Sequence, residues 1–240
     1  METLVRTTAA PILAPGAASA PAPGHFEMRL VTSREDWDAV GELRYRAYRH
    51  RNAIPHNEEG RMREPADTAM NAMTFLLSRG GRPVGTTRTT VRSANRQWPL
   101  PGLTAYRAEL ETSIGVEATI VEASRTVVDP ALVTDSRTPL FHLMKAHVLH
   151  CALEDADWLV CAVREPEIGF YRRMLNMEIL SGPEMYPGLT VRKVLMGLDV
   201  RAQMGLLAKR IPQMSVSRED QEAFTATGSV SFARPAAPRR

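Results

Sequence analysis

The stretch from Val116 to Val128 limits the possible folds more than any other part of the sequence. It is a long run rich in β-branched residues, which is typical of a strand in the centre of a sheet. Directly after it the pattern changes, and from Pro139 onward the apolar residues recur at the spacing of a helix. Asp135 and Ser136 stand before this helix as candidate N-caps. The sequence therefore predicts a domain that combines a sheet with helices.

The segments on either side of this run extend the same prediction. An alternating strand, a helix capped at Ser33 and a hairpin precede it, and short strands follow it with a helix between them. The expected strands span residues 26–30, 73–78, 83–91, 116–128, 158–163, 177–180 and 190–200, and the expected helices begin near residues 33, 139 and 165. This order indicates an α/β (α+β) fold with a mixed, mostly antiparallel central sheet flanked by helices.

One domain is expected between two tails. Residues 1–24 form an Ala/Pro-rich leader, whose prolines exclude the apolar core of a signal peptide and predict disorder. Residues 25–203 are long enough to bury a core without metals or disulfides. Apolar periodicity fades after this point, so residues 204–240 are expected to be a largely flexible C-terminal extension. No apolar run reaches the roughly 18 residues of a transmembrane segment, which predicts a cytoplasmic protein.

Composition narrows the possible partners. The formal net charge is +3, and no dense Lys/Arg run carries interleaved aromatic residues, so nucleic acid is not an expected partner. This mild positive charge would suit an acidic carrier protein or peripheral contact with an anionic membrane. Cys151 and Cys161 form no CxxC pair, and His142, His147 and His150 are expected on a solvated or partly packed helix face. No metal site is therefore expected.

Four short motifs lie in a fixed order on the expected elements. They read LRYRAY at residues 43–48, VGTTR at 84–88, VEASR at 121–125 and IGFYRRMLNM at 168–177. In this combination the chain resembles the GNAT-fold acyltransferases, and among them the group of N-acyl amino acid synthases and autoinducer (acyl-homoserine-lactone) synthases. The resemblance spans roughly residues 26–200. It implies a three-layer α/β/α architecture and an acyl transfer from a thioester to an amine.

The resemblance also implies two catalytic residues. Glu122 would take the proton of the attacking amine, directly or through a water. Its alternative role is an ion pair with a neighbouring arginine. Tyr171 corresponds to the tyrosine that protonates the departing thiolate in many acetyltransferases, and its alternative role is that of a packed helix aromatic.

Further residues are implied for substrate binding. Arg44, Arg88 and Arg125 come from three elements that the fold would bring toward one cleft, where one of them could bind a carboxylate. Their alternative role is to organise the site through acidic partners, for which Asp67 is the best candidate, while Tyr48 would line the pocket. Strand alternation would place Glu122 and Arg125 on opposite faces of the sheet unless a bulge intervenes.

The acyl donor is expected to be a carrier protein. Acetyl-CoA users have a Gly-rich loop that holds the pyrophosphate ahead of the helix, but residues 126–139 contain no glycine. Ser136, Arg137 and Thr138 could instead hold the single phosphate of a phosphopantetheine arm. The expected co-substrate is thus an acyl-phosphopantetheine thioester on acyl carrier protein, with coenzyme A less favoured, and no permanently bound cofactor is expected.

The sequence therefore predicts an N-acyltransferase that moves a fatty acyl group from acyl carrier protein to the amine of an amino acid. Ile54 stands where autoinducer synthases keep a tryptophan, and their acidic pair is not clearly reproduced. Both departures disfavour a lactone synthase. Three alternatives stay open: such a synthase using S-adenosylmethionine, an acetyl-CoA-dependent N-acetyltransferase, and a catalytically inactive GNAT-fold binding module.

Overall fold

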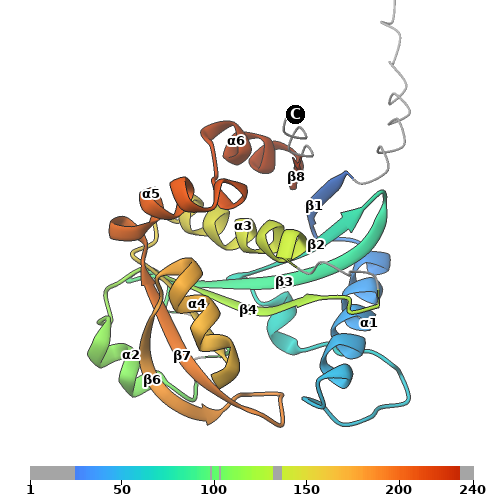
Figure 1. The fold of residues 1–240 in the computed structure, drawn as a ribbon, viewed down its shortest axis with the longest axis horizontal. Helices are drawn as coiled ribbons and strands as arrows, with labels where there is room; N and C mark the ends of the chain where they lie inside the picture. Colours follow the sequence, from blue (N-terminus) through green and yellow to red (C-terminus); the bar gives the residue numbers. More distant parts are fainter. Residues whose placement is uncertain (1–24, 98, 103, 132–136, 233–240) are drawn as a thin grey trace, which may run out of the picture.

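An eight-stranded sheet organises the part of the chain that the structure describes (Figure 1). The computed structural model describes residues 25–97, 99–102, 104–131 and 137–232. The strands are β1 (Phe26–Leu30), β2 (Ala72–Arg79), β3 (Arg82–Arg92), β4 (Ile120–Val128), β5 (Trp158–Val163), β6 (Glu178–Met185), β7 (Arg192–Asp199) and β8 (Ser229–Phe232). The α-helices are α1 (Arg34–His50), α2 (Arg107–Ser113), α3 (Arg137–Leu153), α4 (Ile168–Leu175), α5 (Val200–Arg210) and α6 (Arg218–Thr227).

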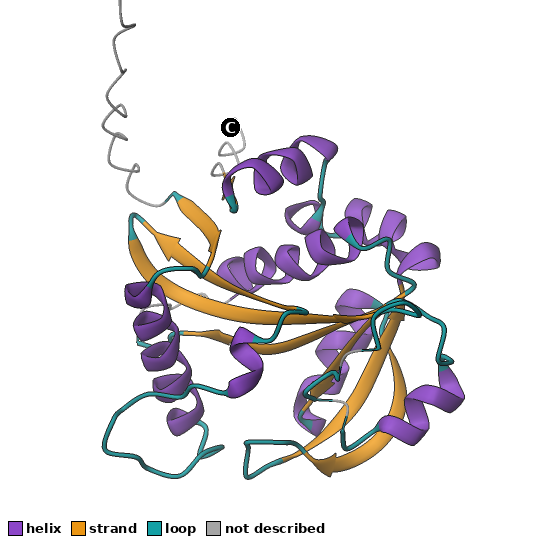
Figure 2. Cartoon of the chain, turned by 180° about the vertical axis from the view of Figure 1, so that it is seen from behind, coloured by secondary structure: helices purple, strands orange, loops and turns teal. Residues whose placement is uncertain are grey.

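The sheet is mixed and mostly antiparallel, as the sequence predicts. Its strand order is β6-β7-β5-β4-β3-β2-β1-β8, and among these neighbours only β4 and β5 run parallel. Successive residues of β2 face opposite sides: Leu76 packs with Leu43 of α1, while Phe75 and Leu77 pack with Leu143 of α3. Helices therefore cover both faces, which gives the three-layer α/β/α architecture (Figure 2).

The parallel pair at the centre of the sheet separates part-way along its length. The pairing of β4 with β5 extends from Ile120 opposite Trp158 to Ala123 opposite Cys161. Beyond these residues β4 stays paired with β3 and β5 stays paired with β7, so the two strands diverge. A cavity of about 230 Å³ lies where they part.

A bulge interrupts β4 at the same point. Thr86 pairs with Val127 and Arg88 with Ser124, so that Arg125 and Thr126 together lie opposite the single residue Thr87. Arg125 has φ 55°, in the left-handed region, which costs a non-glycine residue roughly 1–2 kcal/mol. The extra residue changes which face the following side chains occupy. Strand alternation predicted Glu122 and Arg125 on opposite faces of the sheet unless a bulge intervened, and the structure contains this bulge.

Two segments differ from the sequence-based expectation. Residues 204–232, expected to be largely flexible, continue α5 and form a 3-10 turn (Pro212–Met214), α6 and β8, which pairs with β1. The apolar pattern there is sparse because α5 buries only Leu207 and α6 only Phe224. In addition, α2 lies between the strands expected at residues 83–91 and 116–128, where no helix was expected. Among the residues that the structure describes, none of the helices combines the length and hydropathy that crossing a bilayer requires.

The histidines of α3 are buried, which corrects the expectation of a solvated or partly packed face. His147 Nε2 lies 2.8 Å from Thr87 Oγ1, and His150 Nδ1 lies 2.7 Å from Thr89 Oγ1. Burial lowers the pKa of His147 to about 3 and that of His150 to about 4. Within the described ranges, no group of three or more His, Cys, Asp or Glu residues is placed to hold a metal ion.

These two histidines predict that the protein loses stability as the pH falls below about 6.5. Protons bind more readily to the unfolded chain, where the histidine pKa is near its ordinary value, so acid favours unfolding by up to about 1.4 kcal/mol per pH unit for each histidine. The loss should extend down to pH 3–4, where the folded state also becomes protonated. Denaturant unfolding between pH 7 and pH 5 measures it.

His147→Gln should make the free energy of unfolding less dependent on pH over this range, whatever its effect at pH 7. His50→Gln is the matched control, because His50 is exposed at the end of α1. An equal pH dependence in all three proteins would contradict the prediction.

Candidate active site

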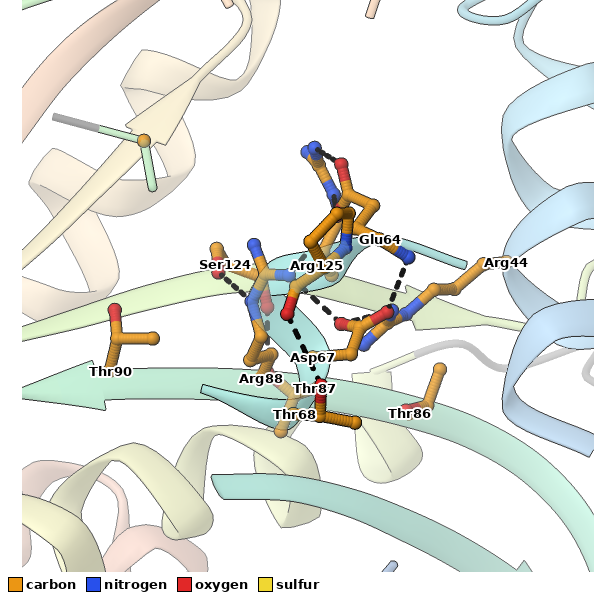
Figure 3. A network of polar contacts seen from close by, with 12 residues as sticks. Arg44, Glu64, Asp67, Thr68, Thr86, Thr87, Arg88, Thr90, Ser124 and Arg125 are labelled. Carbon is orange, nitrogen blue, oxygen red and sulfur yellow. Dashed lines mark hydrogen bonds and ion pairs between the residues drawn. The ribbon is translucent and has the colours of Figure 1, made fainter. Parts of the chain in front are cut away.

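Three arginines and two carboxylates form a buried cluster on one face of the sheet (Figure 3). Arg44 of α1 and Arg88 of β3 each place Nη1 against Asp67 Oδ1, at 2.7 and 2.9 Å. Arg88 Nη1 also lies 3.1 Å from Glu64 Oε2, and Arg125 of β4 donates to the same carboxylate from Nε at 2.6 Å and from Nη2. The two acids belong to one turn, since the Glu64 N–H donates to Asp67 Oδ2 at 2.9 Å. The cluster therefore joins four separate segments.

The cluster has one more positive than negative group. Burial alone would raise the pKa of Glu64 and of Asp67, but the hydrogen bonds and charges of the arginines outweigh it and hold both pKa values below their ordinary range. Both acids are therefore ionised at neutral pH. Several guanidinium nitrogens are buried without a hydrogen-bond partner among the described residues: Arg44 Nε and Nη2, Arg88 Nη2 and Arg125 Nη1. Such unpaired donors are costly unless an anion or water meets them.

Arg125 connects this cluster to the cavity. Its guanidinium lies 5.9 Å from the centre of the Tyr48 ring and 5.0 Å from that of Tyr186, and Nη2 donates to the carbonyl of Pro187 at 2.8 Å. Arg125, Tyr48 and Ser124 all line the cavity. The unpaired Nη1 of Arg125 is thus a donor on a residue of the cavity wall.

Glu122 lies beside the cavity without lining it. Its carboxylate accepts hydrogen bonds from the Gly102 N–H at 3.0 Å, from the Tyr186 hydroxyl at 3.0 Å and from the Thr90 hydroxyl at 3.3 Å. Position 102 requires glycine, because a Cβ there would overlap the Glu122 carboxylate and the Tyr186 hydroxyl. The alternative role for Glu122, an ion pair with an arginine, is not found among the described residues. Burial and the charge of Glu122 raise the pKa of Tyr186 well above its ordinary value, which keeps that hydroxyl a donor.

The cavity is polar at one end and apolar at the other. The polar end contains Tyr48, Arg125, Glu167, Tyr171 and Lys193, whose charges act on one another. The apolar wall belongs to one hydrophobic cluster shared by the sheet, α3, α4 and α5: Met144, Leu159, Leu175, Met177, Leu198, Leu207 and Met214. An elongated molecule with one polar end and one hydrocarbon end would match this distribution.

Tyr171 of α4 lines this cavity. Its ring packs edge-on against Phe170, with centroids 5.4 Å apart, and burial raises the pKa of its hydroxyl well above the ordinary value. The hydroxyl has no hydrogen-bond partner in the part of the chain that the structure describes. Both roles considered for Tyr171, proton donor and packed aromatic, are compatible with this position.

Lys193 of β7 is an additional cation in the cavity wall. Its Nζ lies 4.4 Å from the centre of the Tyr186 ring, and no carboxylate of the described residues is within salt-bridge distance. Burial, with the charge of Arg125, lowers the pKa of Lys193, although Tyr48 and Glu167 partly oppose this shift. Tyr186 thus has two cations near its ring, and both belong to the cavity wall.

The residues expected to bind the donor phosphate lie elsewhere. Arg137 and Thr138 are exposed in the first turn of α3, one turn before Leu140, which lines the cavity. Ser136 lies outside the described residues. The structure therefore places Arg137 and Thr138 near the cavity rim without bringing them into the arginine cluster.

The N-acyl amino acid synthase FeeM family matches residues 39–199, about two thirds of the sequence. The chain belongs to this family. It is accordingly an acyltransferase, with the GNAT-like fold that the sequence predicts. No curated protein matches the chain in sequence.

Solved structures share the fold of this FeeM-family protein at low sequence identity. FeeM, an N-acyl amino acid synthase from uncultured soil microbes, is 20% identical with a TM-score of 0.64, covering 78% of this chain and 98% of its own. The acyl-homoserine-lactone synthase LasI is 15% identical with a TM-score of 0.58, and the match covers 81% of this chain and 99% of LasI. The CoA-dependent acyl-homoserine-lactone synthase BjaI is 17% identical with a TM-score of 0.57, and the match covers 80% of this chain and 92% of BjaI.

Sequence reasoning missed three residues of this FeeM-family site. Glu64 completes an acidic pair with Asp67, and the spacing Glu-x-x-Asp was the available signal. Tyr186 and Lys193 lie near or on strands β6 and β7, where neither stands within a motif. Their roles arise from cross-strand neighbours that only the fold brings together.

The cluster predicts that replacing a buried aspartate lowers the free energy of unfolding far more than replacing a surface one, although each contacts two arginines. Asp67→Asn removes the buried charge between Arg44 and Arg88 and should lower the free energy of unfolding by about 3 kcal/mol. Asp38→Asn is the control, because Asp38 pairs with Arg61 and Arg63 at the surface and should cost less than about 1 kcal/mol. Urea unfolding of both variants measures the difference. Equal losses would show that the buried cluster contributes no special stability.

Proposed function

We propose that this acyltransferase moves a fatty acyl group from acyl carrier protein to the α-amine of an amino acid in the cytoplasm. The observation that carries the proposal is the cavity between β4 and β5, with cations at one end and hydrocarbon at the other. The acyl chain would occupy the apolar end, beside Met144 and Leu175. The thioester carbonyl would then lie where the strands diverge, near backbone N–H groups of β4 that could stabilise the oxyanion.

The acceptor would bind at the polar end through its carboxylate. Arg125 Nη1 is buried without a partner, and Lys193 forms no salt bridge, among the residues that the structure describes. A carboxylate between these two groups would satisfy both and balance the charge of the cluster. An amine without a carboxylate would leave Arg125 Nη1 and the Lys193 ammonium without an acceptor, so an amino acid fits the site better than a simple amine.

The proton steps follow from the neighbours of Glu122. The amine must lose a proton as its nitrogen bonds to the acyl carbon and the carbon–sulfur bond breaks. Neither Glu122 nor Tyr186, whose hydroxyl donates to Glu122, lines the cavity, so we assign the proton of the amine to Glu122 through an intervening water. Tyr171, protonated and in the cavity wall, would donate to the departing sulfur.

A carrier protein as donor rests on the sequence ahead of α3. The absence of glycine from residues 126–139 leaves no loop suited to the pyrophosphate of coenzyme A, whereas a single phosphate needs fewer donors. Arg137 and Thr138 are exposed near the cavity rim, where a phosphopantetheine arm would enter. Comparison of kcat/KM for the same acyl group on carrier protein and on coenzyme A tests this assignment.

The reaction class predicts new lipids in bacteria that express the protein. Mass spectrometry of a lipid extract should detect N-acyl amino acids, and Glu122→Gln should lower kcat of the purified enzyme by about a hundredfold with little change in KM. Thr112→Val, on the exposed part of α2, is a control that should leave both unchanged. A lactone among the products would contradict the proposed acceptor. Full activity of Glu122→Gln would contradict the proposed proton path.

The position of Lys193 predicts that its replacement weakens binding of the amino acid alone. Lys193→Met should raise KM for the amino acid by at least about tenfold, because a charged hydrogen bond is lost, while KM for the acyl donor stays the same. Lys209→Met is the matched control, since Lys209 is exposed on α5. Steady-state kinetics with both substrates varied measures the two constants. An unchanged KM for the amino acid would remove Lys193 from the acceptor site.

A further inference from the structure

Two hollows adjoin each other along α3. The first is the cavity between β4 and β5, and the second is an apolar groove of about 270 Å³ between α3, α5 and residues 214–216. Leu207 and Met214 line both of them. These two side chains therefore form the partition between the cavity and the groove.

The helix α3 shows how the two hollows are aligned. Leu140, Met144 and His147 line the cavity, whereas Val148 and Cys151, further along the same helix, line the groove. With a rise of 1.5 Å per residue, the second set continues the wall of the first by roughly one to two turns. An alkyl chain that follows α3 away from the polar end would meet Leu207 and Met214, and behind them the groove.

The two residues of the partition are buried and held in place by their surroundings. Leu207 and Met214 are 5% and 2% exposed, while the neighbouring Leu206 is 61% exposed, so α5 turns a single leucine inward. The N-cap of α5 is Asp199, which accepts from the Ala202 N–H at 2.9 Å and directly follows the buried end of β7. Because a packed wall yields little, it would end the space available to an acyl chain.

We propose that Leu207 and Met214 form the end wall of the acyl site and set the longest acyl chain that the enzyme accepts. This inference rests on the proposed function for the identity of the ligand. Both residues lie beyond residue 199, where the match to the FeeM family ends. The proposed specificity element thus lies in the C-terminal extension, in addition to the site on β4 and β5.

The wall has a measurable consequence for binding. Each methylene that moves from water into an apolar site is worth about fourfold in affinity. In the wild-type protein, the affinity for alkyl-pantetheine thioethers of increasing length should rise by about this factor per methylene and then stop rising at the wall. Thioethers cannot transfer an acyl group, so their binding reports the cavity whether or not the protein turns over.

The experiment compares this limiting length in Leu207→Ala, Met214→Ala and the double variant by calorimetry. Each single variant should extend the rise by one or more methylenes, and the double variant should extend it further into the groove, with a gain of about tenfold or more for the longest ligands. Leu207→Val serves as a milder change if the alanine variants unfold. Leu149→Ala is the matched control, because Leu149 is a fully buried leucine of α3 that lines neither hollow.

The possible results separate the inference from the proposed function. A limiting length that moves in the wall variants and stays fixed in Leu149→Ala supports the wall, even if no N-acyl amino acid is formed by turnover assays. A limiting length that is the same in folded wild-type and wall variants, or that moves equally in Leu149→Ala, overturns it. Absence of thioether binding at every length would overturn both the wall and the acyl cavity.

Discussion

The carboxylates of Glu64 and Asp67 determine how the rest of the site is arranged. They lie in one short turn and hold three arginines that come from α1, β3 and β4. Removing them would leave three buried cations near one another, which the interior could not tolerate. Because three guanidinium groups share two carboxylates, the cluster also has a positive charge that the described residues leave uncompensated. The interaction that fixes the fold around the cavity thus also leaves a positive charge beside it, which suits the carboxylate of the proposed acceptor.

The strained backbone at Arg125 has its explanation in the same interaction. A left-handed arginine costs roughly 1–2 kcal/mol, and without the bulge its side chain would lie on the face opposite Glu122. The hydrogen bonds to Glu64, the contact with the Pro187 carbonyl and the two aromatic rings offset this cost. Strain and compensation together place one rigid guanidinium between the ion cluster and the cavity. A preorganised donor of this kind loses little entropy when a substrate binds.

The sequence predicted those parts of the molecule whose signals are local. Strand alternation and helical spacing located most elements, and the motifs pointed to Arg44, Arg88 and Arg125 as residues of one cleft. Glu64 was missed because its segment has no regular period. The C-terminal extension was missed because α5 and α6 each bury a single residue, although Ser217 with Asp220 and Gly228 are the capping signals of a helix. Lys193 could not be predicted, since its position beside Tyr186 and Arg125 depends on packing between β7, the end of β6 and the bulge of β4.

The charge of the cavity also bears on the choice between acceptors. S-adenosylmethionine carries a sulfonium cation in addition to its amine and carboxylate, and a site for it needs negative or aromatic groups free to receive that cation. Here Glu167, the acid in the cavity wall, is already paired with Arg164 and Arg51, and the ring of Tyr186 already has Arg125 and Lys193 beside it. A sulfonium would add a third positive charge next to Arg125, which already shares Glu64 with Arg88, and Lys193, which has no salt bridge among the described residues. An ordinary amino acid brings only its carboxylate to these cations once its amine is neutral. This is the electrostatic argument for the proposed N-acylation of an amino acid over lactone synthesis.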